Sequence, residues 1–378
     1  MIINNVKLVL EDEVVNGSLE VRDGRISAFA ESQSRLAEAI DGDSGWLLPG
    51  LIELHTDNLD KFFTPRPKVD WPAHSAMSSH DALMVASGIT TVLDAVAIGD
   101  VRDGGDRLEN LEKMINAVEE TQKRGLNRAE HRLHLRCELP HHTTLPLFEK
   151  LVGREPVSMV SLMDHSPGQR QYADRSKYRD YYQGKYHLTN EQMDAFEEEQ
   201  MALAAAWSQP NRQRIAAICR ERNIALASHD DATCEHVLES RQLGSVIAEF
   251  PTTIAAAQAS RQHGMSVLMG APNIVRGGSH SGNVAAHHLA ASGLLDILSS
   301  DYYPASLLDA AFRIADDEGN AFTLAQAIRL VSQNPAQALG LHDRGAIAEG
   351  KRADLVLARR HGEHIHIDHV WRQGKRVF

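Results

Sequence analysis

The sequence predicts an α/β protein in which a (β/α)₈ barrel is combined with a small β-sandwich built from both ends of the chain. Three observations predict it: strand-like runs at each terminus, eight apolar strand candidates in the middle, and helical stretches between those candidates. Strands that alternate with helices are typical of βαβ units and of a parallel sheet. Eight such units close into a barrel.

Both ends of the chain contain short runs of residues that are typical of β-strands. Residues 6–10, 17–21 and 26–30 form strand-like runs, and the Asp23-Gly24 pair is a hairpin-turn signal. Similar runs recur over 353–358, 364–367 and 369–377. Because chain termini often lie close together, we expect residues 1–48 and 341–378 to form one composite β domain, with a catalytic barrel at 49–340.

The middle of the chain supplies the barrel. The predicted barrel strands are 50–55, 89–94, 133–138, 157–163, 225–229, 245–249, 266–270 and 295–301. Connecting stretches such as 107–124 carry apolar residues at helical spacing. Residues 169–207 form a long charged insertion after the fourth strand, rich in Tyr and Glu. For this insertion we expect either a helical lid or an oligomer contact.

Composition narrows the function classes. The 378 residues include 39 Lys and Arg against 51 Asp and Glu, a net charge of −12, which argues against nucleic acid or an anionic membrane as partner. A small anionic substrate held by local Lys and Arg stays open, as does a homo-oligomer. The chain start lacks a secretory signal and the three cysteines form no CxxC pair, so we expect a cytoplasmic protein. The 20 histidines direct attention to metal or proton chemistry.

Polar residues gather at the carboxyl ends of the predicted strands, where barrel enzymes place their active sites. Imidazoles with carboxylates suit Zn²⁺, Mn²⁺ or Fe²⁺, and their number favours two divalent ions, with zinc or manganese expected. The expected metal ligands are His55, Asp57, Glu138, His165, His229 and Asp301. Residues expected to orient these ligands are Asp164, Asp230 and Glu249. Glu249 also fits a helix-entry position.

Other metal and nucleophile motifs are weaker. His364 and His366 form a His-X-His pair, but they lie in the C-terminal β segment, away from the barrel mouth, and we expect an exposed strand there. The cysteines are expected to be inert. No nucleophile elbow or Walker loop indicates covalent or P-loop chemistry.

Motifs at both ends of the predicted barrel resemble those of the amidohydrolase superfamily. They are residues 47–57 (LLPGLIELHTD), 334–341 (NPAQALGL) and 344–356 (RGAIAEGKRADLV). The resemblance implies a metal-dependent hydrolase with a (β/α)₈ barrel and the composite β domain. The chain departs from the pattern where Asp57 replaces the second His of a His-X-His motif and where Glu249 stands at a position that is often His.

Longer runs resemble one family within that superfamily, the diphosphatases of carbon–phosphorus lyase pathways. These runs are HTDNLDK (55–61), FTPRP (63–67), MDHSPGQRQ (163–171), SHDD (228–231) and GAPNIVRGGSHSGN (270–283). The resemblance implies hydrolysis of α-D-ribose 1-methylphosphonate 5-triphosphate to the 5-phosphate and pyrophosphate, in phosphonate catabolism. A substrate with this much negative charge calls for cations and backbone amides. The expected substrate-binding residues are Lys61, Arg66, Arg170, Lys185, Asn273, Arg276 and His280.

The expected mechanism has a metal-bound hydroxide attack phosphorus in line with the pyrophosphate leaving group, with Asp301 accepting the proton of the water. By resemblance Asp301 also binds one metal. Two alternatives remain at this point: hydrolysis of a C–N bond in a cyclic amide or N-acyl substrate, which this scaffold commonly serves, and a non-catalytic scaffold subunit of a phosphonate-processing complex.

Overall fold

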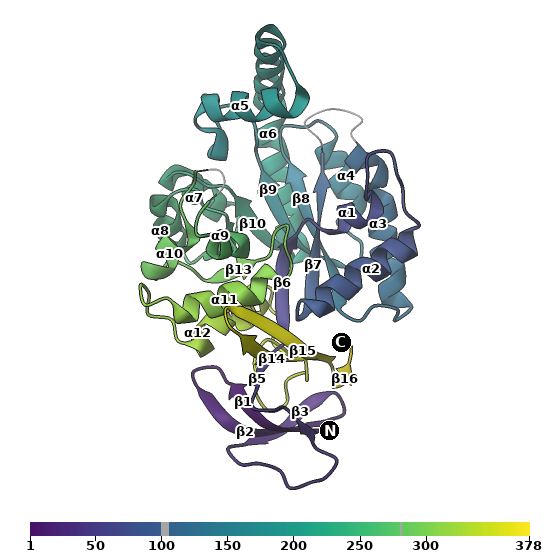
Figure 1. The fold of residues 1–378 in the computed structure, drawn as a ribbon. Helices are drawn as coiled ribbons and strands as arrows, with labels where there is room; N and C mark the ends of the chain where they lie inside the picture. The colour runs from purple at the N-terminus through teal and green to yellow at the C-terminus, as the bar shows by residue number, and fades with distance from the viewer. Residues whose placement is uncertain (100–105, 280–281) are drawn as a thin grey trace.

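The chain folds as a parallel barrel with a mixed sheet at one end and a helical arm at the other (Figure 1). The computed structural model describes residues 1–99, 106–279 and 282–378. Both termini contribute to the mixed sheet, so the predicted fold class is confirmed. Among the described residues, no helix is both long and apolar enough to cross a membrane.

The barrel has eight strands that pair in chain order. They are β6 (Leu51–Thr56), β7 (Ile89–Ile98), β8 (Glu130–Glu138), β9 (Val157–Met163), β10 (Ala225–His229), β11 (Ile247–Glu249), β12 (Ser266–Gly270) and β13 (Ile297–Ser299). A parallel bridge between Thr56 and Asp301 joins the last strand to the first. Every pair of neighbouring strands is parallel, and buried residues run continuously along β6 because both faces of a barrel strand are covered.

The predicted strand positions hold, but several ends differ. β7 extends to Ile98 and β8 begins at Glu130, because these strands pair with each other over a longer register than their apolar cores indicate. The sixth and eighth strands are short, at three residues each. The added residues are apolar in β7 (95–98) and polar in β8 (130–132), so the central apolar run of a strand does not mark where its backbone pairing ends.

The terminal sheet joins the two ends of the chain through one strand. Its strands are β1 (Ile2–Val9), β2 (Val14–Arg22), β3 (Arg25–Ala30), β4 (Ile40–Asp41), β5 (Trp46–Pro49), β14 (Leu355–His361), β15 (His364–Arg372) and β16 (Lys375–Arg376). β5 pairs with β1 in parallel and with β14 antiparallel. Because β5 leads directly into β6, the sheet is tied to the start of the barrel.

Helices cover the outside of the barrel and the arm stands above its mouth. The covering helices are α1 (Leu59–Phe63), α2 (Ala73–Ala86), α3 (Asp106–Lys123), α4 (Thr144–Leu151), α7 (Cys234–Gln242), α8 (Ile254–Gln262), α9 (Ala271–Arg276), α10 (Ala286–Ala291), α11 (Ser306–Asp316), α12 (Leu324–Arg329) and α13 (Gln333–Ala338). The arm consists of α5 (Arg175–Tyr186) and α6 (Asn190–Arg222), whose N-terminus carries a capping box of Thr189 and Gln192. The insertion is therefore largely helical, and its role as a lid or an oligomer contact stays a prediction.

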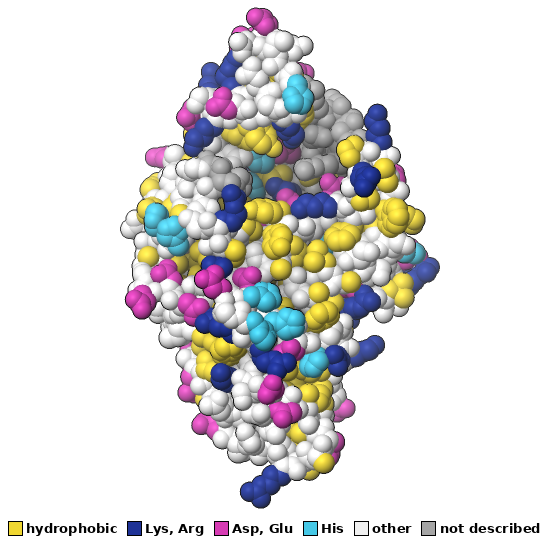
Figure 2. All heavy atoms as spheres, in the orientation of Figure 1, with side chains coloured by type: hydrophobic (Ala, Val, Ile, Leu, Met, Phe, Trp, Pro, Cys, Tyr) yellow, Lys and Arg dark blue, Asp and Glu magenta, His cyan; other side chains and the backbone are white. Residues whose placement is uncertain are grey.

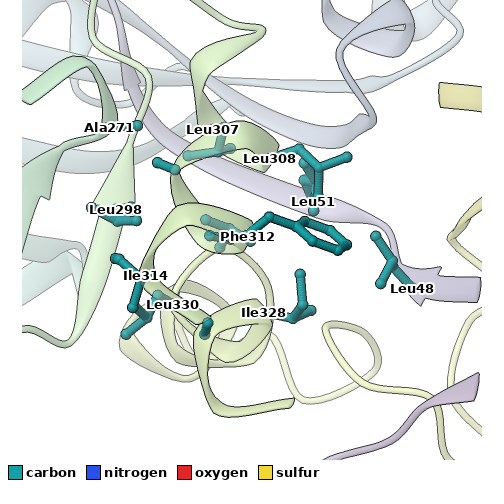
Figure 3. Packing of buried hydrophobic residues seen from close by; sticks show 14 of the residues in the cluster. Leu48, Leu51, Ala271, Leu298, Leu307, Leu308, Phe312, Ile314, Ile328 and Leu330 are labelled. Carbon is teal, nitrogen blue, oxygen red and sulfur yellow. The ribbon is translucent and has the colours of Figure 1, made fainter. Parts of the chain in front are cut away.

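Apolar packing fixes the barrel from inside and outside. One buried cluster draws side chains from seven of the eight barrel strands, including Ile52, Leu93 and Met159, and fills the interior. A larger cluster packs the helices against the barrel wall; in Figure 3, Phe312 of α11 lies between Leu51 and Leu330. The core is filled below the mouth, so the polar groups above it rest on a rigid base.

Candidate metal centre and substrate cavity

A cavity of about 830 Å³ opens at the carboxyl ends of the barrel strands. Strand-end residues form its floor, α5 of the arm forms its roof, and the segment after β12 lines a wall. Figure 2 shows the hollow beneath the arm, with acidic and His side chains visible inside it. All six expected metal ligands line this cavity: His55, Asp57, Glu138, His165, His229 and Asp301.

Glu249 joins two of the cavity histidines from below. Its two carboxylate oxygens lie 2.6 Å from His55 Nδ1 and 2.7 Å from His229 Nδ1, and the side chain is fully buried. Burial raises the pKa of Glu249, but His55, His134 and His229 together lower it by more, and the pKa of the carboxyl lies well below its usual range. Burial lowers the pKa of His55, whereas Glu249 raises it to about 10. Both rings are thus held by their Nδ1 atoms, with Nε2 directed to other groups.

A second carboxylate fixes the third histidine. Glu138 Oε2 lies 2.7 Å from His165 Nδ1, and Glu138 Oε1 accepts the His165 backbone N–H at 3.1 Å. Burial raises the pKa of Glu138, but His165 lowers it to about 2. Asp230 Oδ2 lies 3.7 Å from His165 Nε2 and 3.4 Å from His229 Nε2. Glu138 thus contacts the His165 ring, and Asp230 faces the two Nε2 atoms; metal binding by Glu138 and an orienting role of Asp230 stay predictions.

Two groups of possible metal donors therefore face the cavity. His55, Asp57 and Asp301 form one group, and His165, His229 and Asp230 form the other; within each, one donor atom per residue lies within 4.8 Å of the others. Neutral imidazole nitrogens with carboxylate oxygens are the donor set that Zn²⁺ and Mn²⁺ accept. The residues present fit metal binding of the kind that this fold supports.

A third group, formed by His55, His134 and Glu249, adds no further metal donor to the cavity. His134 lies near His55, but its Nδ1 contacts the Leu54 carbonyl at 3.0 Å and its Nε2 contacts Ser161 Oγ at 2.9 Å. Burial lowers the pKa of His134 to about 3, so the ring is neutral at neutral pH. Both nitrogens are occupied, and we assign His134 a packing role under the floor.

Arg136 is a cavity residue that sequence reasoning missed. Its Nη1 donates to both oxygens of Asp57, at 2.7 and 2.9 Å. Burial lowers the pKa of Arg136, but Asp57 and then Glu249 and Asp301 raise it above its ordinary value. A guanidinium at this point offsets part of the carboxylate charge on the floor. A lone Arg within a strand carries no motif, so the sequence held no signal for it.

Three strand ends turn sharply at the floor. Asp230, Phe250 and Asp301 follow β10, β11 and β13, and each has a left-handed backbone with φ between 55° and 56°. Such a conformation is uncommon for residues with a Cβ and is tolerated where the surroundings hold it. The Phe250 ring packs edge-on to His55 and His229, with centroids 5.2 and 5.5 Å apart. The turns thus aim two carboxylates at the cavity and one aromatic ring at the histidines.

The expected substrate-binding residues divide into two sets. Lys185, Asn273 and Arg276 line the cavity. Lys61 lies beside it, with Nζ 3.3 Å from both Asn58 Oδ1 and the Tyr302 carbonyl, and the exposed Arg66 is not part of the lining. His280 lies outside the described residues.

Arg170 does not reach the cavity wall, in contrast to the expectation. Its guanidinium is 2% exposed and forms ion pairs with Asp231 and with Glu239, the latter at 3.1 Å. Arg212 extends this network to Asp164, at 3.3 Å. Arg170 lies within the sequence run 163–171 that resembles the diphosphatases, but its side chain connects buried loops beneath the site. Its burial in the structure shows this, whereas the motif does not.

Comparisons with known proteins agree with the geometry. A model of the amidohydrolase family matches residues 82–378. The chain is 84% identical, over 378 residues and 100% of both chains, to alpha-D-ribose 1-methylphosphonate 5-triphosphate diphosphatase of Escherichia coli (strain K12). Two solved structures resemble the fold. One is an amidohydrolase, with TM-score 0.64, 15% identity and coverage of 99% and 98% of the two chains. The other is N-acetyl-D-glucosamine-6-phosphate deacetylase from Mycobacterium smegmatis, with TM-score 0.63, 17% identity and full coverage of both chains.

Proposed function

The chain belongs to the amidohydrolase family, and we infer that it hydrolyses α-D-ribose 1-methylphosphonate 5-triphosphate to α-D-ribose 1-methylphosphonate 5-phosphate and pyrophosphate. One observation carries this inference: the identity of 84% to a diphosphatase for this substrate over the full length of both chains. The reaction is a step in phosphonate catabolism. The structural neighbours alone support only the fold, since they share less than a fifth of their residues with this chain.

The cavity suits a substrate with many negative charges. Its floor brings together imidazoles and carboxylates, and its lining also includes the cations Arg136, Lys177, Lys185 and Arg276. Charge-assisted hydrogen bonds to phosphate oxygens are among the strongest polar contacts available to a protein. A hydrolase for a neutral amide would not need so many cations, so the wall composition supports phosphate chemistry.

Two divalent ions, zinc or manganese, are proposed at the floor. His55, Asp57 and Asp301 would hold one, and His165, His229 and Asp230 would hold the other. When bound, such ions supply a more acidic water and neutralise charge on phosphate oxygens. Glu249 and Glu138 keep the Nδ1 atoms of these rings occupied, so that each ring presents its Nε2 atom in one orientation.

The protein's own residues have separate tasks in the proposed reaction. Asp301 accepts the proton of the attacking water, because its carboxylate stands at the floor beside Asp57 and His55. Arg136 holds Asp57 in place and adds positive charge close to the reacting phosphate. Arg276 and Asn273 bind oxygen atoms of the substrate from the wall after β12.

A product analysis tests the proposed function. Purified protein with added Zn²⁺ or Mn²⁺ is incubated with the ribose triphosphate, and phosphorus NMR identifies the products. Equal amounts of pyrophosphate and α-D-ribose 1-methylphosphonate 5-phosphate are expected. Dihydroorotate and N-acyl amino acids serve as C–N substrates and should remain intact. Hydrolysis of either amide without pyrophosphate release would contradict the proposal.

A further inference from the structure

One face of α5 carries two lysines toward the cavity. Lys177, Tyr181 and Lys185 follow each other at intervals of four residues, so they lie along one face of the helix. All three line the cavity. The neighbouring Tyr178 and Tyr182 are buried in an aromatic cluster of the arm. The arm therefore has an apolar side that fixes it and a cationic side that faces the site.

The cations of α5 differ in whether they are paired. Arg179 forms ion pairs with Asp194 at 2.7 Å and with Glu197 at 2.8 Å, both on α6. Over residues 1–99, 106–279 and 282–378, no ion pair involves Lys177 or Lys185, and both are exposed. The arginine holds the two helices of the arm together, whereas the lysines keep their charge available to a ligand.

The arm reaches the opposite wall of the cavity. The Nζ atom of Lys177 lies 3.9 Å from the position that a Cβ at Gly282 would occupy. Gly282 follows Arg276 in the glycine-rich segment after β12, and its φ is +74°. Lys185 lies nearer the aromatic cluster, with Nζ 5.3 Å from the ring centre of Tyr186 and 5.6 Å from that of Tyr181. The two lysines thus span the roof of the cavity.

We propose that Lys177 and Lys185 bind the pyrophosphate end of the substrate and hold it as it leaves. This inference rests on the proposed function. The phosphoryl group that is attacked must lie at the floor, so the rest of the triphosphate and the methylphosphonate extend toward the walls. The departing pyrophosphate carries more negative charge than the methylphosphonate ester, and its charge grows as the bond breaks. Two lysines on the roof match the more charged end, and Arg276 on the other wall matches the less charged end.

Product inhibition tests this assignment. Inhibition by pyrophosphate and by the ribose phosphonate 5-phosphate is measured for the metal-loaded wild type, Lys177→Ala, Lys185→Ala and the double variant. Calorimetric binding of pyrophosphate supplements the kinetics, with metal content measured in each sample because pyrophosphate chelates metal ions. Lys375→Ala, which removes an exposed lysine of β16, is the matched control. The double variant should weaken pyrophosphate binding about tenfold or more, while the other product binds within about threefold of wild type.

The carboxylate on the same roof gives a test of opposite sign. Asp180 is the one carboxylate that the described part of the arm contributes to the cavity lining. Asp180→Asn should tighten pyrophosphate binding, because it removes a negative charge that opposes the ligand. Unchanged pyrophosphate binding in the double lysine variant, or weaker binding of the ribose product instead, would overturn the assignment. A wild-type protein that releases no pyrophosphate would overturn the proposed function itself.

Discussion

Among the described residues, His and Asp side chains gather at two places on the barrel, at the floor of the cavity and on the outside of the barrel. The floor group contains the donors around His55, His165 and His229. The second group, here called the outer cluster, consists of His80, Asp81, Asp94 and His131, between α2 and strands β7 and β8. Both groups have the residue types of a metal site, and every member of the outer cluster is buried.

The two groups differ in where the ring nitrogens point. In the outer cluster, carboxylates contact both nitrogens of His131, with Asp94 Oδ2 at 2.7 Å and Asp81 Oδ1 at 3.1 Å. Asp94 Oδ1 also lies 2.5 Å from His80 Nε2. On the floor, carboxylates below the rings hold Nδ1 and leave Nε2 toward the cavity. Residue types alone therefore do not define a metal site; a ring nitrogen must also face a space that a ligand can enter.

The pKa shifts are alike in the two groups, since His55 and Glu249 on the floor shift in the same directions as His131 and Asp94, so the distinction rests on geometry. Burial raises the pKa of Asp94, but His80 and His131 lower it below its usual range. Burial lowers the pKa of His131, and Asp94 raises it to about 9. The contacts of the outer cluster form an internal network that ties α2 to the barrel, whereas the Nε2 atoms of the floor histidines face the cavity.

Removing a floor histidine should give the largest effect on turnover. His229→Ala deletes a proposed metal donor, so we expect a loss of turnover of about a thousandfold or more and a lower metal content. Metal analysis and pyrophosphate release measure both. His366→Ala, on the exposed face of β15, is the control and should leave both unchanged. Full metal content in His229→Ala would contradict the assignment of His229 as a metal donor.

Asp301→Asn separates proton transfer from metal binding. The amide keeps the size of the side chain but cannot accept the proton at neutral pH, so turnover should fall about a hundredfold or more. The fold and most of the bound metal should remain, as measured by circular dichroism and metal analysis. Turnover near that of wild type would rule out the role of Asp301.

His131→Ala should affect stability and leave the metal site intact. The change removes the His131 ring that lies between Asp81 and Asp94 and leaves Asp94 with His80 as its His partner, so the free energy of unfolding should fall by about 3 kcal/mol. Urea denaturation measures this change. Metal content per folded molecule should match the wild type. A loss of metal with unchanged stability would place metal binding in the outer cluster after all.

A smaller effect on the free energy of unfolding is expected from Glu130, which lies at the junction between the barrel and the terminal sheet. Burial raises the pKa of Glu130, but Arg344 and Arg352 lower it to about 2. A carboxyl with a depressed pKa stabilises the fold above its unfolded pKa, and this stabilisation is lost as pH falls from about 4.5 toward 2. The loss should be about 2 kcal/mol over this range. In Glu130→Gln, acid unfolding followed by fluorescence should therefore show a shallower dependence on pH; an identical pH profile would contradict the assignment.

The sequence predicts the strand order and most floor residues because apolar strands and their polar ends form a local pattern. It does not predict which carboxylate orients a ring and which faces its Nε2 atom. That distinction depends on side-chain direction, as the left-handed turn at Asp230 illustrates. Arg136 and Lys177 carry no motif, and only folding brings them to the cavity. Arg170 lies in a motif yet is buried in ion pairs.

Removal and return of metal tests whether pyrophosphate release depends on divalent ions bound at the floor of the cavity. The wild-type protein is treated with a chelator, dialysed, and assayed for pyrophosphate release from the ribose triphosphate before and after addition of Zn²⁺ or Mn²⁺. Release should stop on metal removal and return with metal, while the contacts of the outer cluster keep the protein folded throughout. Pyrophosphate release at an unchanged rate from the metal-free protein would contradict it.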